Sequence, residues 1–298
     1  WKRCFRNRQL DSHNHPIPLP HAKHPMTGRH GTLDLEFELR NGRTELVHSQ
    51  FHVPLQCFRP YYFDSQGRAY VYILTPTGGI VGGDHLNINV RLGPDCKVFL
   101  TTQAATKVYK TPGQRSRQSL HCLLEKNSSF EYFPDHTILF ADADYEQSTN
   151  VIVASGATMV LADLFSAGRI ARGEQFKFRR FQNEVHIRTI DHSIVIDKML
   201  LQPEEHTPDA VGNFENYPYA GTIYISLEPA RLKDSFDLIE ALPVTQQGVS
   251  GHSRVDPDYG TYRVLTRQAE PLKRAIEQVF STCRQVGLNE PWIPLRKC

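Results

Sequence analysis

The chain has 298 residues, 40% of them hydrophobic, which is enough to bury one large core or two modest ones. Its 34 basic and 32 acidic side chains give a formal charge of +2, and no basic run is interleaved with aromatic residues, so we expect no nucleic-acid partner. No apolar stretch approaches the roughly 20 residues that span a bilayer, and no signal-peptide core follows the N-terminus, so we expect no membrane association. Six scattered cysteines without a CxxC pair indicate free thiols in a reducing cytoplasm.

Residues 1–30 are basic, rich in proline and histidine, and without periodicity, which is typical of a flexible leader. Five histidines fall between His13 and His30. They are compatible with a metal-collecting tail, but nothing fixes the spacing that a defined site needs. We therefore interpret the leader as a polar linker.

Alternating apolar residues predict a strand over 33–39, and Asn41-Gly42 predicts a hairpin to a partner strand near 44–49. A further β-prone run, 69–74, leads to a turn that Asp84 closes and that contains Gly78, Gly79, Gly82 and Gly83. Such a density of glycine requires positive φ angles or a close approach by another group. A phosphate cradle is disfavoured, because the pattern is neither GxGxxG nor a Walker loop and leads into a strand.

After Asp84 a pattern recurs at intervals of roughly thirty residues: two apolar runs are joined by a short turn of small residues. It occupies residues 86–100, 119–133 and 150–165. Each unit alone would expose an apolar face, so stacking the units is the natural way to bury it. The pattern predicts a mainly β protein whose body, residues 31–202, is a β-solenoid or β-helix. A sandwich with Greek-key connections is the alternative.

The remaining strands of the body are expected at 176–180, 185–189 and 193–201. Beyond residue 202 the character changes. A polar loop over 203–216 precedes a strand at 221–227, a helix at 230–241 that extends its apolar stripe to Leu242, a strand at 261–266, and a helix at 268–286. Residues 203–298 are thus predicted to form a small α+β portion with two helices, packed on the body.

Three carboxylates interrupt or border apolar strands: Asp84, Asp163 and Asp197. A buried carboxylate must be ion-paired, hydrogen-bonded or neutral. Each is therefore either a structural ion pair or turn cap, with Arg169 or Lys198 as a candidate partner, or a functional group.

Catalytic motifs are weak in this chain. There is no GxSxG elbow, no HExxH and no cysteine beside a base, and Asp135-His136 is more simply an exposed turn than an acid–base pair. A β-rich metal-dependent hydrolase that uses the three carboxylates stays as the enzymatic alternative.

Four motifs occur in order at residues 76–84, 100–109, 134–140 and 167–176. They read PTGGIVGGD, LTTQAATKVY, PDHTILF and AGRIARGEQF. Together they resemble the urease accessory protein D family, also called H. The likeness runs from about residue 31 to residue 201, thins out in the C-terminal third and is absent from the leader. Phe133 and His136 depart from the residues that relatives often carry.

This resemblance implies a non-enzymatic, cytoplasmic nickel chaperone with no tightly bound cofactor. Such proteins bind the urease accessory proteins F and G, the latter a GTPase, and apo-urease, usually as a dimer of heterotrimers. Ni²⁺ released by the GTPase would pass through the D protein towards urease. Carried over motif by motif, the passage would use Asp84, Asp163 and Asp197 as transient metal contacts, with Gly82, Gly83, Thr106, Lys107, Arg169 and Glu174 lining or supporting it.

Isolated carboxylates suit such a passage. Conduction requires binding that draws an ion in and still releases it. A dense cage of histidine and cysteine would retain nickel, which lies near the tight end of the divalent series. A pure adaptor with no metal path is the remaining alternative, and under it all three aspartates could be neutralised without effect on urease activation.

Overall fold

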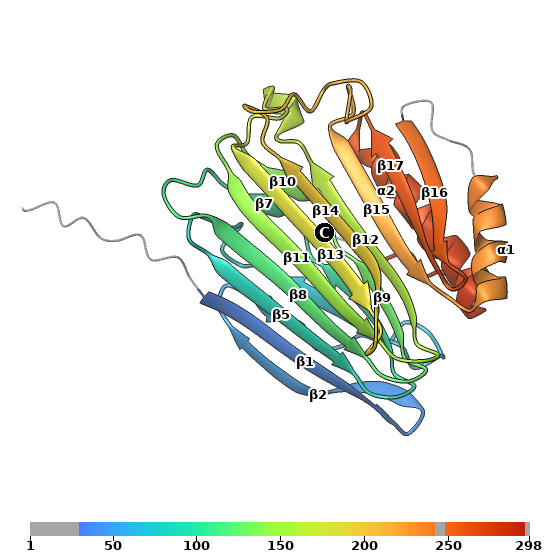
Figure 1. The fold of residues 1–298 in the computed structure, drawn as a ribbon. Coiled ribbons are helices and arrows are strands. Elements are labelled where there is room, and N and C mark those ends of the chain that lie inside the picture. The colour runs from blue at the N-terminus through green and yellow to red at the C-terminus, as the bar shows by residue number, and fades with distance from the viewer. Residues whose placement is uncertain (1–29, 242–247, 296–298) are drawn as a thin grey trace, which may run out of the picture.

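A computed structural model describes residues 30–241 and 248–295, and it consists of two β-sheets that face each other across a hydrophobic core (Figure 1). The first sheet has seven strands in the order β14-β13-β11-β8-β5-β1-β2, and the second has ten, in the order β16-β17-β15-β12-β9-β6-β4-β3 with β10 and β7 branching from β12. The first sheet comprises β1 (His30–Arg40), β2 (Arg43–His52), β5 (His85–Leu92), β8 (Ser116–Leu124), β11 (Asp144–Val153), β13 (Arg180–Arg188) and β14 (Ser193–Leu201).

The second sheet comprises β3 (Gln56–Cys57), β4 (Ala69–Leu74), β6 (Lys97–Thr102), β7 (Thr106–Val108), β9 (Ser129–Phe133), β10 (Thr137–Leu139), β12 (Thr158–Ser166), β15 (Tyr219–Ser226), β16 (Gly248–Asp256) and β17 (Tyr259–Thr266). Helix α1 (Pro229–Glu240) and helix α2 (Ala269–Thr282) lie at its C-terminal end (Figure 1). A 3₁₀ turn, η1, spans Ile170–Arg172, and a π-helical segment, η2 (Cys283–Leu288), continues α2.

The predicted repeat is a β-solenoid of about four turns, so the solenoid prediction is confirmed. Each recurring unit crosses from the first sheet to the second, as β5–β6, β8–β9 and β11–β12, and pairs in parallel with the next unit. The register stacks like side chains: Ile88 faces Leu120 in the first sheet, and Val98 faces Phe130 in the second. Greek-key connections would have given antiparallel neighbours, and these central strands are parallel.

The glycine turn after β4 behaves as its composition predicts. Gly78 and Gly83 have φ angles of 80° and 83°, in the left-handed region. Gly79 is needed for a close approach by another group, since a side chain there would collide with the carbonyl of Lys107 and the ring of Tyr109. This close approach allows the Ile80 N–H to donate to the Lys107 carbonyl at 2.7 Å. The turn is thereby attached to β7, in a short parallel ladder that continues through β10 to the end of β12.

One strand prediction was wrong, and the edge strand β16 was not predicted at all. Residues 176–179 are not a strand, because Phe176 takes a φ of 51° and donates its N–H to the carbonyl of Ala167, which folds the chain back before β13 begins at Arg180. Strand β16 was missed, because its sequence is polar and its side chains are nearly all exposed at the edge of the sheet. Residues 1–29 of the predicted leader, Leu242 and the last three residues lie outside the described residues, and His30 begins β1.

The C-terminal portion continues the body's own sheet. Strand β15 pairs antiparallel with β12 over the full length of β15, and β17 and β16 extend the sheet beyond it. A second apolar cluster, which includes Phe236, Ile276 and Phe280, packs helices α1 and α2 on the outer face of this extension. The change of character near residue 202 therefore marks the end of the solenoid turns within one continuous sheet.

A buried group of charged side chains joins the C-terminal segment to the body. Glu131, on β9, lies between two guanidinium groups, with Arg284 Nη2 at 2.7 Å and Arg68 Nη1 at 3.0 Å from its Oε2. Arg68 also pairs with Glu290 at 2.8 Å. Burial acts to lower the pKa of Arg284, but its interactions with Glu131 and Tyr70 together raise the pKa, so the group stays ionised. These pairs attach the end of the chain to β4 and β9.

We expect Arg284→Met to lower the free energy of unfolding by ~3–5 kcal/mol, because removing one partner of a buried ion pair leaves the other charge undercompensated. Urea denaturation followed by circular dichroism measures the change. The matched control is Arg274→Met, which removes an exposed arginine that pairs with Glu270 along α2 and should cost no more than about 0.5 kcal/mol. Equal losses in the two variants would contradict a structural role for the buried group.

Candidate functional site

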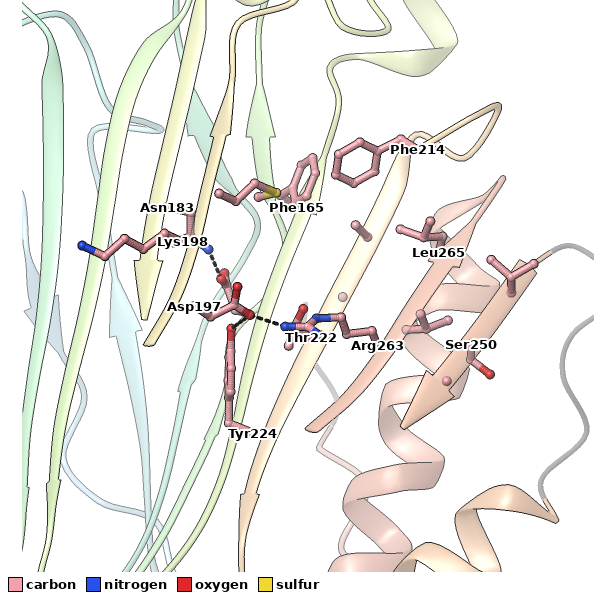
Figure 2. A pocket seen from close by; sticks show the side chains of 17 residues that line it. Phe165, Asn183, Asp197, Lys198, Phe214, Thr222, Tyr224, Ser250, Arg263 and Leu265 are labelled. Carbon is pink, nitrogen blue, oxygen red and sulfur yellow. Dashed lines mark hydrogen bonds and ion pairs between the residues drawn. The ribbon is translucent and has the colours of Figure 1, made fainter. Parts of the chain in front are cut away.

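A cavity of about 490 Å³ lies where the two sheets separate, beyond the last solenoid turn (Figure 2). Strands β13 and β14 of the first sheet form one side of it, and β12, β15, β17 and β16 of the second sheet form the other. Phe165, Phe214 and Leu265 contribute apolar walls. Its polar lining includes Asp163, Asn183, Asp197, Thr222, Tyr224, Ser250 and Arg263.

Strand alternation explains why Asp163 reaches this cavity. Met159, Leu161 and Phe165 point from β12 into the core between the sheets, and Asp163 shares their face because side chains two apart along a strand point the same way. Residues 160, 162 and 164 pack instead against the helices. Asp163 is therefore a carboxylate at a position that the neighbouring pattern reserves for apolar side chains.

Two amide groups hold the Asp163 carboxylate. Its Oδ1 accepts from Gln147 Nε2 at 2.9 Å, and its Oδ2 accepts a short hydrogen bond from Asn183 Nδ2. Within residues 30–241 and 248–295 it forms no ion pair. Burial raises the pKa of Asp163, the two amide donors oppose that shift, and the nearby charge of Asp197 adds to it. The carboxylate is desolvated without a cation beside it, which is an energetically unfavourable arrangement.

Asp197 reaches the same cavity from the opposite sheet. Its Oδ2 accepts from Tyr224 OH at 2.8 Å and from Arg263 Nη2 at 2.6 Å, so it links β14 to β15 and β17 (Figure 2). The sequence-based partner was wrong. Lys198, one residue along β14, points to the opposite face and pairs with Glu184 at 3.0 Å, because adjacent side chains of a strand alternate.

A second, smaller cavity lies on the other side of Asp163, inside the solenoid. Its volume is about 20 Å³, room for roughly one water molecule. Thr106, Gln118, Tyr132, Asp135, Gln147 and Thr149 are among its lining residues, and Asp163 lines it as well. Asp163 is therefore the residue that lines both cavities.

Asp84 lies apart from both cavities. It is buried, and its Oδ2 accepts from the Val81 N–H at 2.9 Å, which closes the glycine turn. Its carbonyl accepts from the Arg117 N–H at 2.7 Å. The structure brings Asp163 and Asp197 together and leaves Asp84 in the turn, beside Gly82 and Gly83.

Among the other residues predicted to line or support a passage, Thr106 lines the smaller cavity, and the rest line neither. Lys107 is exposed on β7. Arg169 stacks on Phe140, 4.2 Å from the ring centre, and forms a short ion pair with Glu174. The hydrogen bond from Arg169 holds the pKa of Glu174 below its ordinary value. This pair fixes the loop after β12, and Arg169 is thus not a partner of the three aspartates.

The exposed turn predicted at Asp135-His136 is half-buried instead. The Asp135 N–H donates to Thr102 Oγ1 at 2.8 Å, which draws the turn against β6.

In the part of the chain that the structure describes, Cys57, Cys96, Cys122 and Cys283 are free thiols.

Sequence reasoning missed several polar side chains of the site, among them Gln147, Asn183, Tyr224 and Arg263. Gln147 and Asn183 carried a signal, since both occupy inward-facing positions of strands whose neighbours at that spacing are apolar. Arg263 interrupts an apolar strand in the same way. Its partnership with Asp197 depends on two strands 66 residues apart in sequence, and no local pattern could reveal it.

Across the described ranges, no group of three or more histidine, cysteine, aspartate or glutamate side chains is arranged to hold a metal ion. Nor does any helix in those ranges have the length and apolar character needed to cross a membrane. The cavity thus offers two carboxylates, held by amides, a phenol and a guanidinium, and can contact a cation without enclosing it.

Comparison with known proteins agrees with the four motifs. The family model described as UreD urease accessory protein matches residues 29–297. A urease accessory protein UreD 2 from Streptomyces griseus is 42% identical over 278 residues, which cover 90% of this chain and 93% of that protein. A urease accessory protein UreD from Bacillus cereus is 30% identical over 271 residues, 90% of this chain and 98% of that protein. These relatives are named as accessory proteins and not as enzymes. The chain therefore belongs to the UreD family of urease accessory proteins and has a role in urease maturation.

Proposed function

We propose that this protein is a scaffold and nickel conduit, which passes Ni²⁺ from a GTPase accessory protein towards apo-urease. The observation that supports the conduit most directly is the position of Asp163, which borders a cavity on each side and lies near Asp197. An ion that moves from one cavity to the other would meet these carboxylates in succession.

The chemistry of the cavity suits a cation in transit. Two carboxylates attract a divalent ion, but they are fewer ligands than a retaining site needs, and they lack the imidazole and thiolate groups that hold nickel tightly. The amides of Gln147 and Asn183 keep the Asp163 carboxylate in place when no ion is present. Binding that is favourable and weak is the condition for onward transfer.

The proposal extends to partners and place. We propose that the chain binds urease accessory proteins F and G together with apo-urease, as a dimer of heterotrimers in the cytoplasm. Asp84 stays a predicted contact at another point of the route, in the turn that joins β4 to β5. Family membership supports the proposal, since relatives are named urease accessory proteins.

The first test is Asp163→Asn, which removes the charge and keeps the size of the side chain. We expect urease activation to fall about tenfold, because a neutral amide is a poor ligand for a divalent ion, while assembly with the partners persists. Urease activity, measured after co-expression and normalised to co-purified complex, gives the result. The control is Asp142→Asn, which removes an exposed carboxylate paired with Lys110 and should leave activation unchanged. Full activation by Asp163→Asn would favour an adaptor without a metal path.

Asp84 requires two variants, because it also closes a turn. Asp84→Asn keeps an oxygen that can accept from the Val81 N–H, so we expect the protein to fold and assemble while activation falls. Asp84→Ala removes that acceptor and should also lower the free energy of unfolding by ~1–3 kcal/mol. Denaturant melts and activation assays on the same preparations distinguish the two effects. If both variants lose activity only in proportion to lost stability, Asp84 is structural alone.

The raised pKa of Asp163 predicts a dependence of stability on pH. The native state binds the proton more tightly than the unfolded state, so ionising Asp163 lowers stability as pH rises from the unfolded pKa through the folded one. The penalty is absent below the unfolded pKa and complete above the folded pKa. We expect Asp163→Asn to be more stable than the wild type near neutral pH, with a difference that shrinks towards pH 4. Urea melts at several pH values measure it, and a constant difference would contradict the prediction.

A further inference from the structure

Arg263 is the cation that faces the two carboxylates of the larger cavity. It lies on β17 opposite Thr222, which in turn lies opposite Asp163 on β12, so one row across three strands carries Arg263 towards Asp163. Its guanidinium contacts Asp197 from the other sheet (Figure 2). The other cavity-lining cation, Lys198, directs its ammonium away from the cavity and pairs with Glu184.

The ion pair between Arg263 and Asp197 has the features of a weak contact. Only Nη2 of the guanidinium contacts the carboxylate, so the pair lacks the two parallel hydrogen bonds of the strongest arginine–carboxylate geometry. The Arg263 side chain is 57% exposed, in contrast to the fully buried Arg68 and Arg284. Ion pairs that reach solvent contribute little to stability, because water solvates the separated charges well.

The charges in the cavity indicate what this ion pair does. Asp163 and Asp197 together carry two negative charges when ionised, and Arg263 offsets one of them. A divalent cation between the carboxylates would offset both, and the arginine would then be a surplus positive charge beside the metal. Like charges in a partly desolvated site repel, so metal binding and the Arg263 contact oppose each other.

We infer that Arg263 is a displaceable counter-ion, whose guanidinium neutralises Asp197 while the cavity is empty of metal and withdraws to solvent when Ni²⁺ binds. The inference rests on the proposed function and assigns Arg263 a positioning role in it. By competing for Asp197, Arg263 weakens nickel binding and speeds release. Its return to the carboxylate would favour onward movement of the ion.

The test compares nickel binding to the full chain in the wild type, Arg263→Met and Arg263→Lys. Isothermal titration with Ni²⁺ gives the affinity, and release to a chromogenic chelator gives the dissociation rate. Histidines elsewhere in the chain can also bind nickel, so each value is taken relative to the Asp163→Asn/Asp197→Asn double variant, which lacks the cavity carboxylates. We expect Arg263→Met to bind about fivefold more tightly, the size of effect that a partly exposed ion pair can exert. Release should slow by a similar factor, and Arg263→Lys should restore much of the wild-type behaviour.

The control variant is Lys198→Met. It removes one positive charge from the residue next to Asp197, but one paired with Glu184 on the outer face, so cavity-dependent affinity should stay at the wild-type value. A general charge effect would tighten binding in both variants and overturn the inference. So would cavity-dependent binding that is unchanged by Arg263→Met.

The two proposals fail in different ways. If the double variant binds nickel as well as the wild type does, the cavity carboxylates do not contact the metal and the conduit itself is wrong. If the double variant loses binding while Arg263→Met matches the wild type, the conduit stands and the counter-ion role is wrong.

Discussion

Burial of one apolar face by the next unit of the same chain is the constraint on which this molecule depends. Each recurring unit supplies one strand to each sheet, and its inward side chains find partners only when the following unit stacks on it. The stack ends at β14 in the first sheet, while β15, β17 and β16 carry the second sheet further. The sheets cannot remain closed against each other beyond that point, and the larger cavity forms there.

Two carboxylates inside the protein, the buried Glu131 and the half-buried Asp163, have opposite surroundings. Glu131 lies between Arg68 and Arg284, so its charge is matched at short range and the pairing holds the C-terminal segment on the body. Asp163 receives only amide hydrogen bonds, which orient a carboxylate without cancelling its charge. An ionised Asp163 without a cationic partner lowers the stability of the folded protein. Such a loss of stability is expected where function requires the group. The contrast distinguishes a structural charge from a candidate functional one.

The arginines that contact carboxylates also differ in burial. Arg68 and Arg284 are fully enclosed, whereas Arg263 reaches solvent and contacts Asp197 through a single nitrogen. Arg169 belongs to neither set, since it stacks on Phe140 and fixes the loop after β12 through Glu174. Carboxylates from both sheets enter the cavity, and one half-exposed cation contacts one of them. Under the proposed function, this arrangement serves a passing ion more than a resident one. Membership of the UreD family places this cavity in a protein with a role in urease maturation.

The amino-acid pattern alone determined the solenoid, the glycine turn and both helices, and it identified all three carboxylates, because each of these follows from local periodicity or backbone sterics. Alternation along β12 and β14 was enough to identify Asp163 and Asp197 as anomalous. Only the tertiary structure decided that Asp163 and Asp197 meet while Asp84 lies away from them, and that Arg263, not Lys198 or Arg169, contacts Asp197. Those contacts join strands far apart in sequence, and the geometry with which the two sheets separate is fixed by the packing of the whole stack and by no local segment.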